Sequence, residues 1–121
     1  MCALIGSRFG AAPFLSPANL LHIRDAIDRI RSYTHQGKEA FFTSSLLQDA
    51  VIRNLEVIGE AAKRISPSTK AQAAEIPWQL VAGMRDVLIH GYFGVDLEIV
   101  WSVVDQRLPE LADVVDRLLA T

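Results

Sequence analysis

The chain has 121 residues, the size of a typical single domain, and half of them are hydrophobic, too large a share for a disordered chain. The formal net charge of −2 excludes a nucleic-acid binder that relies on bulk positive charge. The single cysteine, Cys2, excludes a disulfide or a thiolate zinc cluster within one chain and fits a reducing cytoplasm.

Residues 1–15 predict an irregular N-terminal tail, and residues 16–121 predict one helical domain. In the tail, Arg8 interrupts the apolar stretch, and Gly10 and Pro13 come soon after. This pattern is unlike a signal peptide or a membrane span. From Ser16 onward the spacing of the apolar residues becomes helical.

The first expected helix runs from Ser16 to about Gly37. Ser16 supplies an N-cap hydroxyl and Pro17 stands at the first helical position, a combination typical of helix starts. The apolar residues of this segment recur at steps of three and four, and we expect them to face the core: Leu20, Ile23, Ile27 and Ile30, followed by Tyr33 or Thr34.

The second expected helix begins at Thr43 or Ser44 and ends at Ser66-Pro67. Its core stripe is Leu47, Val51, Leu55, Ile58, Ala62 and Ile65. Gly59 costs helix stability and therefore favours close packing against a neighbour. A charged ladder lies on the other side, and we interpret it as a solvated or a dimer-facing surface: Arg53, Glu56, Glu60 and Arg64.

Residues 66–76 predict a connector with a short helical turn over residues 70–74. A third helix is expected over residues 77–90, and a fourth over residues 97–119 with Asp96 as its cap. The apolar stripe of the third helix is Val81, Met84 and Leu88, and that of the fourth is Val100, Val104, Leu108, Leu111, Val115 and Leu118. Pro109 lies inside the fourth helix, where it removes the hydrogen bond to Asp105 and should kink the helix. Four amphipathic helices without a strand pattern predict an all-α, antiparallel four-helix bundle.

Known chemical motifs are missing from the sequence, which contains no glycine-rich phosphate loop, His-Glu-x-x-His pair, EF-hand loop or nucleophile elbow. We therefore predict neither a metal site nor a cofactor. His22 and His35 lie on the first helix, where a lone histidine is usually a surface or satisfied polar residue. His90 differs, because it lies in a polar cluster at the end of the third helix.

This cluster consists of Arg85, Asp86, His90 and Tyr92, with Gly91 inside it. Arg85 and His90 are about 140° apart around a regular helix. They meet only if the helix breaks at Gly91 or if a two-fold axis brings two copies together, and the dimer is the simpler hypothesis. The alternative is an ordinary helix end, at which His90 contacts the last carbonyls and Arg85 pairs with a surface carboxylate.

The cluster resembles the mark of the HEPN superfamily (higher eukaryote and prokaryote nucleotide-binding domain), which is Arg, a polar residue, a short spacer and His. Further segments resemble its HepT toxin subfamily, from about Leu20 to Leu119. These segments are residues 50–66, Ile76-Pro77-Trp78, Met84-Arg85-Asp86, His90-Gly91-Tyr92-Phe93, residues 95–101 and Leu108-Pro109-Glu110-Leu111.

The resemblance implies a homodimer of helical bundles that acts as a metal-independent endoribonuclease. It also implies a small nucleotidyltransferase antitoxin of the MntA type that AMPylates Tyr92. We expect RNA as the substrate, and neither DNA nor a membrane as a partner.

The residue chemistry agrees with these roles. Cleavage of RNA by its own 2′-hydroxyl needs a group that exchanges protons near neutral pH, and His90 is the candidate. Arg85 fits the stabilisation of negative charge on the phosphorus oxygens. Asp86 either orients His90 or Arg85 or forms a local salt bridge. A nucleotide added to Tyr92 would fill the site and repel RNA.

Two other classes of function stay open from the sequence. The first is a non-catalytic interaction module that uses the same dimer and groove to hold a nucleotidyltransferase or a nucleotide. The second is a structural helical dimer without chemistry, which an occluded groove around Arg85 and His90 would support.

Overall fold

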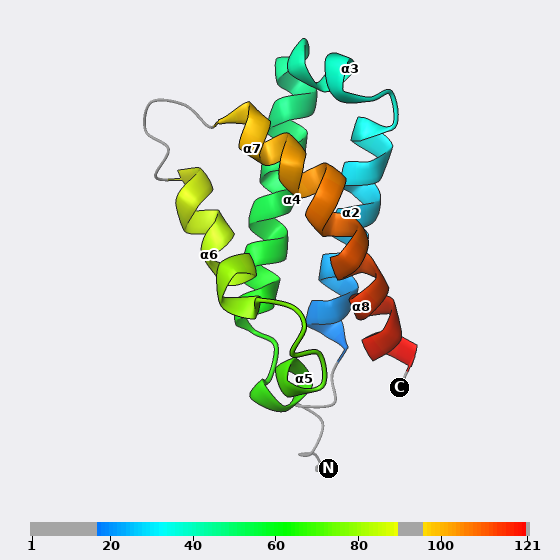
Figure 1. The fold of residues 1–121 in the computed structure, drawn as a ribbon, viewed down its shortest axis with the longest axis vertical. Helices are drawn as coiled ribbons and strands as arrows, with labels where there is room; N and C mark the ends of the chain where they lie inside the picture. The colour runs from blue at the N-terminus through cyan, green and yellow to red at the C-terminus, as the bar shows by residue number, and fades with distance from the viewer. Residues whose placement is uncertain (1–16, 90–95, 121) are drawn as a thin grey trace, which may run out of the picture.

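The computed structural model describes residues 17–89 and 96–120, and over residues 85–89 it describes the backbone alone. Three long helices are α2 (Ala18–Thr34), α4 (Ser45–Lys63) and α6 (Trp78–Ile89), and the C-terminal helical run starts at Leu97. These four units alternate in direction (Figure 1). No strand occurs in the described part, so the prediction of an all-α antiparallel bundle is confirmed. None of the helices in that part is both long and apolar enough to cross a membrane.

The C-terminal run is divided into α7 (Leu97–Ser102), a π-helical turn η1 (Val103–Arg107) and α8 (Leu108–Ala120). The predicted cap is confirmed, because Asp96 Oδ1 accepts hydrogen bonds from the backbone N–H groups of Glu98 and Ile99 at 3.0 and 3.4 Å. The expected kink at Pro109 takes the form of the π-helical turn before it.

The π-helical turn η1 accommodates Pro109 better than a regular α-helical turn would. In η1 the backbone N–H of Leu108 donates to the carbonyl of Val103, five residues earlier. Pro109 has no N–H, and in a regular α-turn its ring would crowd the carbonyl of Asp105. The wider turn relieves this crowding, and the helix continues to Ala120 without a sharp end.

The first helix is shorter than predicted. It ends at Thr34, whose Oγ1 donates to the carbonyl of Ile30 at 2.8 Å, and Gly37 then takes a φ of 99°. That left-handed conformation favours glycine and turns the chain away from the axis of α2. Pro17 lies at the N-cap and not at the first helical position, and Ser16 lies outside the described residues.

A short helix, α3 (Lys38–Phe42), comes directly after Gly37 and was not predicted. Its Phe41 is fully buried, with the ring centroid 5.5 Å from that of Trp101. One buried aromatic residue in five is too little periodicity to indicate a helix from sequence. The packing of Phe41 against the bundle therefore explains this element.

The connector after α4 contains α5 (Pro67–Ala71), which begins three residues before the predicted turn over residues 70–74. Ser66 Oγ accepts from the backbone N–H of Thr69 at 3.2 Å, and Pro67 is the first helical residue. Ser66-Pro67 therefore starts α5, whereas α4 ends at Lys63, three residues before the predicted end at Ser66-Pro67. The predicted start of α4 is confirmed, because Ser44 Oγ accepts from the N–H of Leu47.

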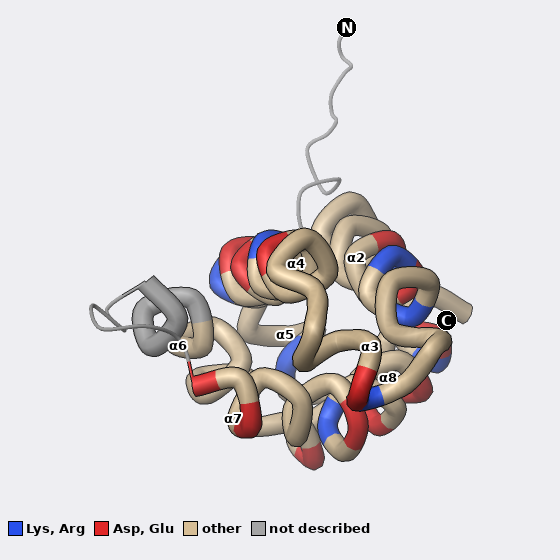
Figure 2. The backbone as a smooth tube through the Cα atoms, turned by 90° about the horizontal axis from the view of Figure 1, so that it is seen from above, with Lys and Arg blue, Asp and Glu red and all other residues tan. Residues whose placement is uncertain are grey.

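The core lies between α2 and α4 on one side and the C-terminal run on the other, as Figure 2 shows from above. α6 packs along α4 at one flank of the bundle. The large, fully buried side chains include these residues of the predicted stripes: Ile23, Ile27, Ile30, Val51, Leu55, Ile58, Val100 and Val115.

Candidate functional site

The base of α6 is held in place by its first residue. Trp78 is 7% exposed, and its Nε1 donates to the carbonyl of Ala73 at 3.0 Å. Since Ala73 lies in the connector after α5, this bond fixes the start of the helix that carries the predicted cluster.

The same connector is tied to α8 by Arg117. Its Nη1 donates to Glu75 Oε2 at 2.7 Å, and its Nη2 donates to the carbonyl of Gln72 at 3.3 Å. The hydrogen bond from Arg117 holds the pKa of the Glu75 carboxyl below its ordinary value. Both side chains are half exposed, so the clamp positions the connector more than it stabilises the fold.

The cluster itself is described in part. Arg85 and Asp86 lie on the backbone of the C-terminal half of α6, and the structure does not describe their side chains. His90 and Tyr92 lie outside the described residues, as does Gly91. α6 is helical through Ile89, so the regular helical rotation that we assumed between Arg85 and His90 holds from Arg85 to Ile89. Whether the two residues meet stays a prediction.

The charged ladder of α4 faces outward, as Figure 2 shows. Together with two residues of α2 it lines a hollow of about 330 Å³. The polar lining residues are Asn19, His22, Arg53, Glu56, Glu60 and Arg64. Arg53 Nη1 lies 3.9 Å from Glu56 Oε1, and Asn19 Nδ2 donates to the carbonyl of Arg64 at 3.3 Å. The ladder was predicted, but the contribution of α2 depends on how the helices pack.

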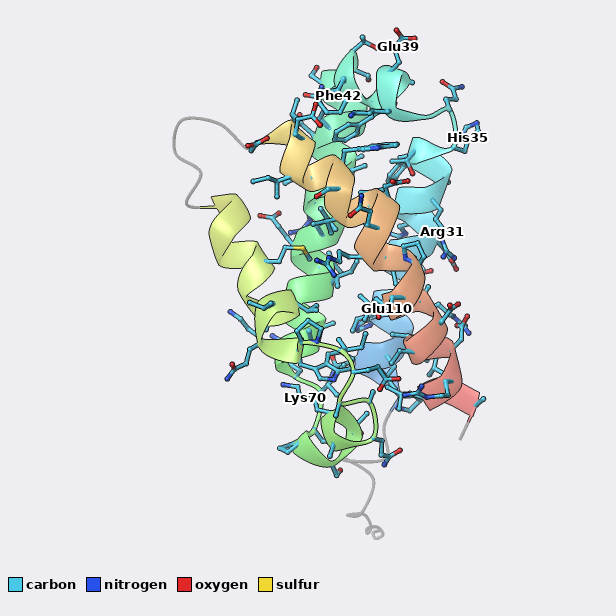
Figure 3. The ribbon with its side chains drawn as sticks, in the orientation of Figure 1. Arg31, His35, Glu39, Phe42, Lys70 and Glu110 are labelled. Carbon is cyan, nitrogen blue, oxygen red and sulfur yellow. The ribbon has the colours of Figure 1, made fainter. Side chains whose placement is uncertain are left out.

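The two histidines of α2 and its C-cap are exposed, as their interpretation as surface residues predicts. His22 lines the polar hollow. His35 lies at the outer end of α2, beyond Arg31, and points away from the bundle (Figure 3), with Nδ1 2.8 Å from the carbonyl oxygen of Ser32. In the described part of the chain, no group of three His, Cys, Asp or Glu residues is placed to share a metal ion.

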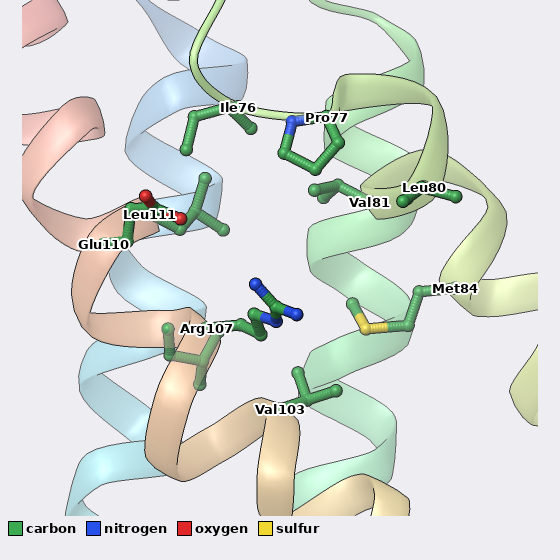
Figure 4. A pocket seen from close by; sticks show the side chains of 10 residues that line it. Ile76, Pro77, Leu80, Val81, Met84, Val103, Arg107, Glu110 and Leu111 are labelled. Carbon is green, nitrogen blue, oxygen red and sulfur yellow. The ribbon is translucent and has the colours of Figure 1, made fainter.

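A second hollow lies between α6 and the C-terminal run. It has a volume of about 330 Å³ and is mostly aliphatic (Figure 4). Its lining includes Ile76, Leu80, Val81, Met84, Val103 and Leu111. We call it the α6–α8 groove. Arg107 extends into it from η1, and Glu110 lies at its edge.

Sequence reasoning missed this groove. The stripe that contains Val81 and Met84 indicates a core-facing side of α6, and both residues are indeed partly buried against the core. However, α6 packs mainly on α4, and the π-helical turn directs Arg107 into the remaining space. In the sequence, Pro109 indicated that the helix is disturbed at this point, because a proline favours a widened turn there. It did not indicate that a groove forms beside the turn.

Comparison with known proteins gives a consistent result. The model of the family described as "Ribonuclease HepT-like" matches residues 23–118. The chain is 43% identical over 97 residues to a protein of Thermococcus cleftensis named "Probable ribonuclease HepT", and the match covers 79% of this chain and 88% of that relative. No solved structure matches the chain.

A longer relative is also similar. It is a protein of Methanocaldococcus jannaschii named "Gamma-glutamylcyclotransferase and putative RNase", 45% identical over 101 residues. The match covers 83% of this chain but 46% of the relative, so the chain spans under half the length of that protein.

Proposed function

Because the chain belongs to the HepT-like ribonuclease family, we propose that it is a metal-independent endoribonuclease, the cytoplasmic toxin of a toxin–antitoxin pair. The observation that carries the proposal is the family match over residues 23–118, which spans the whole Arg85 to Tyr92 cluster. The α6 geometry supports it, because Arg85 and Asp86 lie on a helix that is anchored at its base.

In the proposed reaction, His90 takes the proton from the 2′-hydroxyl of RNA. The 2′-oxygen then bonds to phosphorus, the bond from phosphorus to the 5′-oxygen breaks, and the 5′-oxygen receives a proton from water. The protonated His90 afterwards returns its proton to water. The products are a 2′,3′-cyclic phosphate and a 5′-hydroxyl. Arg85 neutralises the charge that builds up on the phosphorus oxygens, and Asp86 orients one of these two side chains.

A two-fold dimer completes the site in this proposal. It would bring Arg85 of one chain close to His90 of the other. Within one chain the two residues lie about 140° apart around a regular helix and therefore do not meet. Gly83 supports the dimer. A Cβ at Gly83 would meet no atom within 4 Å, so nothing in the described fold requires this glycine. Glycine inside a helix costs about 1 kcal/mol of stability relative to alanine. A second chain that approaches α6 closely at Gly83 would explain why glycine occupies this position.

Regulation is proposed to act on Tyr92. A nucleotidyltransferase antitoxin would join the Tyr92 oxygen to the α-phosphorus of ATP, with release of pyrophosphate and loss of the phenolic proton. The added phosphate would repel the RNA backbone next to His90. Mass spectrometry of the co-expressed chain tests this step, and an unchanged mass of the Tyr92 peptide would contradict it.

The activity is tested by expression and by cleavage in vitro. We expect wild-type expression to arrest growth and the purified chain to cleave RNA in the presence of a metal chelator. Arg85→Ala and His90→Ala should each lower the cleavage rate by about a hundredfold or more. Arg31→Ala and His35→Ala are matched controls, since both residues are exposed at the outer end of α2. Continued toxicity of both motif variants would overturn the proposal.

Mixing the two inactive variants tests the shared site. If Arg85 and His90 come from different chains, a mixed dimer of Arg85→Ala and His90→Ala contains one intact site. Random pairing of equal amounts should then restore about a quarter of the wild-type rate. No recovery would favour a site within one chain, formed by a break at Gly91.

The non-catalytic alternative gives a different result in the same experiments. It predicts a complex with a nucleotidyltransferase and no RNA cleavage by the unmodified wild-type chain. Growth arrest without cleavage would therefore favour the interaction module over the ribonuclease.

A further inference from the structure

The α6–α8 groove combines aliphatic walls with the cation of Arg107. In the described part of the chain, Arg107 takes part in no ion pair, although its guanidinium extends into the groove (Figure 4). Leu80, which lines the groove, is 73% exposed. Exposed aliphatic residues that border a hollow are typical of a protein interaction site.

The lining does not suit RNA. Bases bind to proteins by stacking on aromatic rings, and the described residues that line the groove include no aromatic side chain. A phosphate backbone needs net positive charge, whereas Arg107 and Glu110 together leave this lining neutral. Aliphatic side chains and a methionine instead fit a protein helix with an apolar stripe.

A second copy of this chain does not suit the groove either. A two-fold contact brings the same surface of each chain together, and two concave surfaces cannot fill one another. Such a contact would also place two Arg107 side chains in one apolar space, where like charges repel.

We propose that the α6–α8 groove binds an amphipathic helix of the nucleotidyltransferase partner, one that presents aliphatic side chains and a carboxylate that pairs with Arg107. Arg107 is exposed in the free chain. Charge complementarity supports this occupant, because an apolar helix that covers the Arg107 guanidinium buries its charge, which is costly without a partner carboxylate. This inference rests on the proposed function, which supplies the partner.

The position of the groove fits a partner that modifies Tyr92. Met84 lines the groove and directly precedes Arg85 on α6. The described part of α6 ends at Ile89, and Tyr92 is three positions further along the chain, a reach of about 11 Å at most. A protein docked along α6 is therefore held close to the residue that it modifies.

The test uses calorimetry to measure the affinity of the purified chain for the proposed nucleotidyltransferase partner, which is first identified as a complex with the wild-type chain. We expect Arg107→Glu and Leu80→Glu each to weaken binding by about tenfold or more. Arg31→Glu and Leu46→Glu are the matched controls, because Arg31 is exposed on α2 and Leu46 is 77% exposed at the start of α4. Both controls should bind within about twofold of wild type. Circular dichroism confirms that all four variants fold.

A charge reversal sharpens the test. Among single Asp→Arg and Glu→Arg variants of the partner, one should restore binding to the Arg107→Glu chain. RNA cleavage is measured in parallel, and both groove variants should keep the wild-type rate.

Three results would overturn the inference. Wild-type affinity in both groove variants would show that the partner binds elsewhere. Loss of RNA cleavage with intact partner binding would assign the groove to the substrate. If the wild-type chain forms no complex with a nucleotidyltransferase, both the proposed partner and this inference are wrong. The cleavage assay tests the ribonuclease activity independently of this result.

Discussion

The two flanks of α6 differ in how they pack. On the flank that faces α4 and at its base, the helix is buried, with Trp78 7% exposed and hydrogen-bonded to Ala73. On the flank that faces α8, the aliphatic side chains stay open, and Leu80 is 73% exposed. One side of α6 therefore stabilises the fold, and the other remains available for binding.

The strongest test of this difference compares two residues that are two positions apart. Trp78→Ala should lower the free energy of unfolding by about 3–5 kcal/mol, because it empties a buried site and leaves the Ala73 carbonyl without its donor. Leu80→Ala should change it by no more than about 0.5 kcal/mol. Urea denaturation measures both. Similar losses for the two variants would mean that the groove side is also packed, for example against a second chain.

An intermediate effect is expected at the start of the C-terminal run, where Asp96 caps α7. Asp96→Ala removes the acceptor of two backbone hydrogen bonds and should cost about 1 kcal/mol. Asp96→Asn keeps an acceptor and should cost less. Thermal unfolding of the three proteins checks the order, and equal losses for Ala and Asn would contradict a capping role.

The smallest effect is expected at the clamp between the α6 connector and α8. The folded state lowers the pKa of Glu75, so the clamp stabilises the protein above the unfolded pKa and loses this effect as pH falls through the folded value. Glu75→Gln should therefore lower the melting temperature slightly at neutral pH, and the difference should vanish in acid. A difference that persists in acid would indicate a contact other than the ion pair.

Predictions from sequence succeeded where one periodicity extended over many residues. The stripe from Leu47 to Ile65 located α4, although the helix ends at Lys63. The hydroxyl of Ser44 and the carboxylate of Asp96 marked helix starts, because capping depends on neighbours along the chain. They failed at α3, where a single buried residue, Phe41, holds the helix through a distant contact with Trp101. At η1, Pro109 indicated a disturbance but not its form.

The candidate site shows the same division. The composition of the Arg85 to Tyr92 cluster and its place at the end of α6 are readable from the chain, because they depend on residue type and helical spacing. The open flank of α6 is not, because Met84 has the same spacing whether a helix covers it or not. The groove and the direction of Arg107 result from how α6, α4 and α8 pack, which depends on contacts between segments far apart in the sequence.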